Sequence, residues 1–198
     1  ADPPYQPASC VSSPLINIGS IAYMEAICSD TLPDDDALKN TVVYRKYSLY
    51  EFLSNNINYL DSSAVIDSFY TACNFDNIGA LFALNQKMTE LADTAVLANK
   101  STLLDKLTEA GALTSALNTT DAYSINQRNV NKVLFKLLVY GSELLNADDS
   151  TALASIANQC LYTGGLAVAQ ARALYSASEE YRYCDETALC PGGISARL

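Results

Sequence analysis

The residues of this chain with the most reactive side chains are its six cysteines: Cys10, Cys28, Cys73, Cys160, Cys184 and Cys190. An even number of cysteines without metal-type spacing is typical of disulfide-bonded proteins, which persist in oxidising compartments. The chain has no histidine, which removes the commonest general base and the commonest metal ligand. The sequence therefore predicts an extracellular, disulfide-bonded protein with few residues suited to catalysis.

The spacing of the cysteines argues against a metal site. Structural zinc sites use cysteine pairs separated by about two to four residues, whereas the closest pair here, Cys184 and Cys190, is separated by five. Calcium is not expected either, because the glycine and glutamate pattern of the EF-hand loop is missing. We therefore expect neither a bound metal nor a cofactor.

The sequence also lacks the residues and motifs that enzymes commonly use for catalysis. A nucleophilic triad would have no base, and no phosphate-binding or dinucleotide-binding glycine pattern occurs in the sequence. The clustered carboxylates are Asp34, Asp35 and Asp36, then Asp148 and Asp149, then Glu179 and Glu180. They fall at predicted helix ends, where capping of free amide groups explains acidic residues. The sequence therefore predicts no catalytic residue and a protein that is not an enzyme.

Composition places the chain among folded, acidic proteins. It has 198 residues, of which 49% are hydrophobic and 17% are charged, so it has enough apolar surface to build a core. The formal net charge is -10 and the pI is about 4.3. An acidic surface repels phosphate backbones and anionic lipid headgroups, so nucleic acids and membrane surfaces are not expected partners.

Apolar residues recur at helical spacing along almost the whole chain, and no stretch has the alternation of a strand. A first helix is predicted over 14–28, and later helices are expected to begin at polar caps: Asp34, the 61–63 segment, Asp76, Ser101 and the 147–150 segment. The last helix is predicted to reach Tyr181, with a kink or close helix crossing at Gly164 and Gly165. The predicted fold class is all-α, an antiparallel bundle of about six or seven helices stapled by disulfides.

The two ends of the chain differ from its middle. Residues 1–13 are rich in proline and serine and predict an extended arm, 14–183 form the helical bundle domain, and 184–198 form a cysteine-containing tail. Six cysteines permit fifteen pairings, and we favour those that staple the arm and the tail onto the bundle. Secretion implies a leader that has been removed, and a membrane anchor is expected to be missing beyond the C-terminal end.

Two other groups of residues have a predicted role outside the cell. Asn99 and Asn118 begin N-glycosylation triplets, and both fall at predicted turns between helices. The chain has 13 tyrosines and no tryptophan, and Tyr44, Tyr47 and Tyr50 lie at helical spacing beside Arg45. Because tyrosine and arginine are enriched at protein interfaces, these four residues are the predicted partner-binding site, although such a stripe more often forms the half-buried edge of a core.

These observations are consistent with three functional hypotheses. The first is a non-enzymatic secreted or cell-surface interaction protein, such as a receptor, adhesin or surface antigen, that binds another macromolecule. The second is an extracellular carrier of a lipid or other small apolar ligand, which requires a closed apolar cavity of several hundred cubic ångströms. The third is a structural component of an extracellular matrix or silk. An interaction protein is expected to show an exposed apolar or tyrosine-rich patch instead of a closed cavity.

Overall fold

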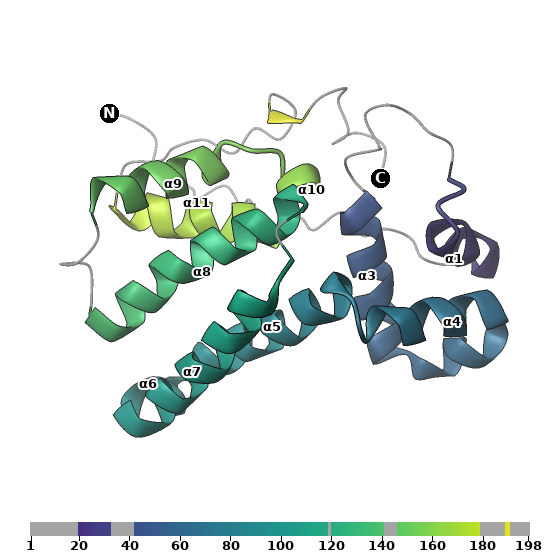
Figure 1. Cartoon of the computed structure of the whole chain (residues 1–198), viewed down its shortest axis with the longest axis horizontal. Helices are drawn as coiled ribbons and strands as arrows, with labels where there is room; N and C mark the ends of the chain where they lie inside the picture. Colours follow the sequence, from purple (N-terminus) through teal and green to yellow (C-terminus); the bar gives the residue numbers. More distant parts are fainter. Residues whose placement is uncertain (1–19, 33–41, 119, 141–145, 179–188, 191–198) are drawn as a thin grey trace, which may run out of the picture.

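The regular structure of the chain is helical, as the sequence predicts. The computed structural model describes residues 20–32, 42–118, 120–140, 146–178 and 189–190, and these contain eleven helices and no strand (Figure 1). The helices are α1 (Ile21–Cys28), α3 (Val42–Asn55), the 3₁₀ helix η1 (Ile57–Ser62), α4 (Ala64–Cys73), α5 (Asn77–Leu91), α6 (Thr94–Ala98), α7 (Lys100–Ala116), α8 (Ala122–Tyr140), α9 (Ala147–Ala157), α10 (Leu161–Gly164) and α11 (Leu166–Ser178). Across these described segments, no helix combines the length and apolar character needed to cross a bilayer.

Polar caps start many of these helices. Ser63 caps α4, and the carboxylate of Asp76 accepts hydrogen bonds from the backbone N–H groups of Ile78 at 2.7 Å and Gly79 at 3.3 Å at the start of α5. Each cap satisfies amide groups that the first turn of a helix leaves without an internal partner. The predicted caps in the 61–63 segment and at Asp76 are thus confirmed, whereas α7 is capped by Asn99 and not by Ser101.

Helix α9 begins with a reciprocal capping box. The Asn146 side chain accepts from the N–H of Asp149, and the Asp149 carboxylate accepts from the N–H of Asn146. Lys136 of α8 also reaches both oxygens of that carboxylate, at 2.7 and 2.8 Å. This ion pair joins α8 to α9 and lowers the pKa of Asp149 below its ordinary value, with the backbone hydrogen bond from Asn146 acting in the same direction.

Replacing Asp149 by asparagine is expected to lower the free energy of unfolding by about 1 kcal/mol at neutral pH. Because the folded protein favours the carboxylate, this contribution is fully present above the unfolded-state pKa of aspartate and is lost as the pH falls through the lower folded-state value. Chemical denaturation of both proteins at pH 7 and at about pH 2 measures the effect. A difference that stays the same at both pH values would contradict an electrostatic role.

The apolar side chains form three clusters of buried residues. One lies between α1, α3 and α4 and includes Met24, Leu49 and Ile66, all fully buried. A second fills the space between α8, α9 and α11, around Val130 and Val168, and the third joins α3, α5, α7, α8 and α10. In Figure 1, α8, α9 and α11 lie on one side of the molecule and α1, α3 and α4 on the other, with α5 and α7 running alongside each other below α8.

The helices are more numerous than the six or seven predicted because several predicted helices are broken. The predicted helix after Asp34 becomes α3 and η1, which are separated at Asn56, and the predicted last helix becomes α9, α10 and α11. Gly165 ends α10 with a positive φ of 81°, a conformation that favours glycine. A Cβ on Gly165 would lie 2.5 Å from the ring of Tyr123, so the backbone passes close to α8 at this point. The predicted break at Gly164 and Gly165 is therefore confirmed.

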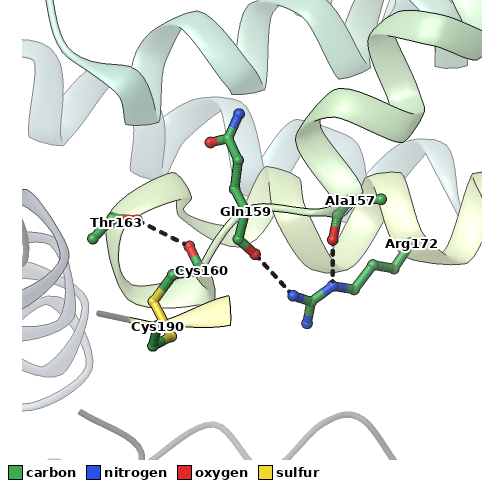
Figure 2. The surroundings of a disulfide bond; sticks show 6 residues. All are labelled: Ala157, Gln159, Cys160, Thr163, Arg172 and Cys190. Carbon is green, nitrogen blue, oxygen red and sulfur yellow. Dashed lines mark hydrogen bonds between the residues drawn. A yellow bond between two sulfur atoms is a disulfide. The ribbon is translucent and has the colours of Figure 1, made fainter. Parts of the chain in front are cut away.

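A disulfide and a buried arginine fix the turn between α9 and α10 (Figure 2). Cys160 bonds to Cys190, and both are almost fully buried. The guanidinium of Arg172, on α11, donates to the backbone carbonyls of Ala157 and Gln159, each at 2.9 Å. Helix ends leave such carbonyls without intrahelical partners, so Arg172 satisfies the end of α9 while the disulfide holds a distant part of the chain against it.

Candidate functional site

An open groove lies where α1, α3 and α4 meet, and it is the strongest candidate for a functional site among the described residues. Its volume is about 640 Å³. The groove is lined by Cys28 at the end of α1, Lys46 on α3, a face of α4 and the α5 cap: Cys28, Lys46, Ala64, Val65, Ser68, Phe69, Ala72, Cys73 and Asp76. The lining thus combines four apolar side chains and two thiols with one hydroxyl, one amine and one carboxylate.

Polar contacts hold the three helices around the groove. Lys46 pairs with Asp30 at 2.7 Å, which ties α3 to the turn that follows α1. Asp30 has a φ of 53°, in the left-handed region that aspartate tolerates better than most residues. On the other side, the Ser63 hydroxyl at the start of α4 donates to the carboxylate of Glu25 on α1. The groove walls are therefore connected by side-chain bonds as well as by apolar packing.

The two cysteines of the groove are thiols in this structure. Burial raises the pKa of Cys28 from its ordinary value near 9 to about 11. Burial also raises the pKa of Cys73 to about 12, and the nearby Asp76 carboxylate acts in the same direction. Because the thiolate is the nucleophile, both thiols react slowly at neutral pH and faster as the pH rises.

One exposed apolar residue lines the groove, and another lies between lining residues in the sequence. Phe75 is 89% exposed in the turn between α4 and α5, between the groove residues Cys73 and Asp76, and Val65 in the groove wall is 42% exposed. This exposed aromatic residue was not predicted as a site residue from the sequence. A signal was available, because Phe75 is an aromatic residue between Asn74 and the cap Asp76, a position where helical packing does not require an apolar side chain.

The predicted partner-binding stripe requires a correction. Tyr44, Arg45, Tyr47 and Tyr50 are only 8%, 8%, 3% and 5% exposed, so they are core residues and not a binding surface. Burial raises the pKa of all three of these tyrosines. Tyr44 packs edge-on against Tyr162 of α10 with ring centroids 5.6 Å apart. The tyrosines thus join α3 to helices that are distant in sequence.

The other predicted site residues fall into three groups. The Cys160–Cys190 disulfide is formed, which confirms two of the six predicted disulfide cysteines, whereas Cys10 and Cys184 lie outside the described residues. Asn99 and Asn118 are both exposed at turns, at the two ends of α7.

Of the predicted carboxylate clusters, only Asp148 and Asp149 lie within the described residues. Asp149 is engaged with Lys136 and the α9 cap, while Asp34 to Asp36, Glu179 and Glu180 lie outside the described residues. Within the described ranges, no three residues of the cysteine, aspartate and glutamate types come together as metal ligands.

Comparison with known proteins gives no relative. No protein-family model, no curated protein and no solved structure matches the chain.

Proposed function

We propose that this chain is a non-enzymatic, secreted or cell-surface helical protein that binds another protein, and that the groove with Phe75 at its edge is the binding face. The observation that carries the proposal is Phe75 itself, since a phenylalanine that is 89% exposed beside an open apolar groove gains free energy when a partner covers it. Buried aromatic anchors commonly supply much of the binding energy at protein interfaces.

The lining of the groove favours a peptide segment of a partner protein as the occupant. Val65, Phe69 and Ala72 offer an apolar floor for a side chain, while Ser68, Lys46 and Asp76 offer polar groups around it. Interfaces combine an apolar centre with a polar rim in the same way. The groove is open, so an occupant inserts one side chain and remains in contact with water elsewhere.

The proposal predicts that replacing Phe75 by aspartate abolishes partner binding without unfolding the protein. The side chain is almost fully exposed, so the free energy of unfolding should change by no more than about 0.5 kcal/mol. The experiment captures proteins from extracellular fluid of the producing tissue on the wild-type chain and on F75D, then measures the affinity of each captured protein by surface plasmon resonance.

The matched control is Ile57→Asp, because Ile57 is 66% exposed on η1 and does not line the groove. A genuine partner keeps its affinity for I57D and loses at least about 10-fold for F75D, the effect of removing a modest anchor. Equal binding to the wild type, F75D and I57D would reject Phe75 as an anchor and the groove as the binding face.

The carrier is the second candidate. The groove volume of about 640 Å³ falls in the range of small-molecule sites, although the groove is open and a carrier is expected to enclose its ligand. Titration with a fluorescent fatty acid separates the two readings. Saturable binding at one site per chain that Val65→Asp removes would support the carrier. Absence of such binding, together with a partner that depends on Phe75, would support the interaction protein.

Extracellular location predicts that Asn99 and Asn118 are glycosylated. The side-chain oxygen Oδ1 of Asn99 accepts from the N–H groups of Ser101 and Thr102, so the side-chain nitrogen Nδ2 remains available to carry a sugar while the cap is kept. Ser101→Ala and Thr120→Ala each remove an acceptor triplet without touching the asparagine. Each variant, secreted from eukaryotic cells, should lose the mass of one glycan by intact mass spectrometry. Unchanged masses for both variants would contradict the use of these sites.

The same proposal includes disulfides that clamp the end segments onto a helical bundle outside the cytosol. It is supported by the Cys160–Cys190 bond, which ties residue 190 to the α9–α10 turn. A C-terminal membrane anchor belongs to the cell-surface form of the proposal, in which the binding face is displayed from a membrane.

A further inference from the structure

We propose that Cys28 and Cys73 form an intramolecular disulfide when the protein matures, and that this bond locks α1 onto α4 across the groove. The proposal rests on the extracellular location proposed above, because such a bond persists in an oxidising compartment. Each cysteine is the last residue of its helix, α1 packs against α4, and both side chains line the same groove.

Contacts between α1 and the first half of α4 hold these two helices together. Met24 and Ile27 of α1 pack with Ile66 of α4 in one buried cluster, and the Glu25–Ser63 hydrogen bond joins the same helices. Lys46 lines the groove together with both cysteines and is held by Asp30, which follows α1 closely. Closing the bond therefore requires the ends of α1 and α4 to approach each other across the groove that both cysteines line.

The known disulfide narrows the alternatives. With Cys160 and Cys190 bonded, four cysteines remain, and these permit three pairings. Only one of the three joins the two cysteines that share the groove, and it leaves Cys10 and Cys184 to bond to each other. The proposal thus selects one complete pairing out of three, and a single peptide map distinguishes them.

The reaction is a thiol–disulfide exchange with a low-molecular-weight disulfide such as glutathione disulfide. Cys28 is half-buried whereas Cys73 is only 2% exposed, so Cys28 reacts first. Its thiolate attacks one sulfur of glutathione disulfide, breaks that S–S bond, and releases one glutathione thiolate, which takes up a proton. The Cys73 thiolate then attacks the Cys28 sulfur of the mixed disulfide and releases the second glutathione. Two protein thiols are oxidised and one glutathione disulfide is reduced to two glutathione molecules.

Cys28 therefore carries out the first step and Cys73 the second, and substituting each cysteine in turn tests these roles. Cys73→Ser retains the first step and should accumulate a glutathione adduct on Cys28. Cys28→Ser retains only the shielded thiol and should form at least about 10-fold less adduct in the same time, since access limits exchange. Because the pKa of Cys28 is about 11, the rate of the first step should rise about 10-fold for each pH unit between pH 7 and 9.

The test uses the full chain, purified with Cys28 and Cys73 reduced and then incubated with glutathione disulfide. Remaining thiols are blocked with N-ethylmaleimide before digestion without reductant, and the peptides are identified by mass spectrometry. The proposal predicts one cross-linked species that joins the Cys28 and Cys73 peptides, and its absence from both serine variants. Because a defined oxidant replaces the cell, this result does not depend on the proposed secretion or on any binding partner.

Two results would overturn the proposal. One is a cross-link from Cys28 or Cys73 to Cys10 or Cys184, which would select one of the other two pairings. The other is recovery of both residues as N-ethylmaleimide adducts after prolonged oxidation at pH 9. A loss of secretion with an intact Cys28–Cys73 cross-link would instead count against the proposed location alone.

Discussion

Replacing Gly79 by alanine is expected to lower the free energy of unfolding by about 3 kcal/mol, because the added methyl group has no space. Gly79 is buried in the first turn of α5, and a Cβ there would overlap the carbonyl oxygen of Cys73 and lie 3.1 Å from its carbonyl carbon. The obstacle is the backbone at the end of α4, which a side-chain rotation does not remove. Urea denaturation followed by circular dichroism measures the change as a lower midpoint with little change in slope.

Gly111 provides the matched control, because it lies within α7 and a Cβ at this position would meet nothing within 4 Å. Gly111→Ala should raise the free energy of unfolding by about 0.5–1 kcal/mol, since alanine is the better helix former. The two glycine substitutions are chemically identical and should act in opposite directions. A similar effect at both positions would contradict the close contact between α4 and α5.

The second large effect is expected from removing the Cys160–Cys190 disulfide. The bond joins residues 30 apart in sequence, and the chain-entropy model gives a cross-link of this length a stabilising effect of about 3.5 kcal/mol. The double substitution Cys160→Ser, Cys190→Ser removes the bond without leaving a free thiol. Denaturation without reductant should show the whole loss, and limited proteolysis should cleave the released 189–190 segment earlier.

Unfolding in a reductant separates the stabilising effect of the cross-link from that of the packing of the two sulfur atoms. In dithiothreitol, which breaks the bond in the parent protein, the parent and the double variant should unfold at nearly the same urea concentration. Any other disulfide is reduced in both proteins alike and does not affect the comparison. A difference of several kcal/mol that persists in reductant would show that the serine side chains disturb the buried site in some other way.

Local signals in the sequence were sufficient to predict the helical class and several helix boundaries. Ser63 and Asp76 cap helices in the structure because a short polar side chain at the cap satisfies amide groups of its own first turn, an interaction within a few residues. The break at Gly164 and Gly165 was predictable for a similar reason, because the residue type itself indicates an unusual backbone or a close approach.

Burial of the tyrosines was not predictable from their spacing. Tyr44, Tyr47 and Tyr50 lie three residues apart, which gives a stripe on α3 but does not indicate what covers it. In the structure the cover includes Tyr123 of α8 and Tyr162 of α10, about 70 to 120 residues further along the chain. Such contacts depend on the tertiary arrangement, and an amphipathic aromatic residue suits either a core edge or an interface.

The groove was unpredictable for the same physical reason. Cys28, Lys46 and Phe69 come from three different helices, and no local pattern relates them. The two cysteines were predicted as disulfide residues, but six cysteines leave fifteen pairings open. Only the packing of α1 against α4 brings Cys28 and Cys73 to one surface and makes one pairing preferable.

Mass spectrometry of the protein from its native source tests most directly the central claim, that the chain is an oxidised extracellular scaffold. The protein is denatured in N-ethylmaleimide without reductant, and its intact mass is compared before and after treatment with a glycosidase that releases N-linked glycans. The account predicts no N-ethylmaleimide adduct, six further adducts once the protein is reduced, and a mass loss on deglycosylation. Several adducts without reduction, on a chain with unmodified Asn99 and Asn118, would place the protein in a reducing compartment and contradict the account.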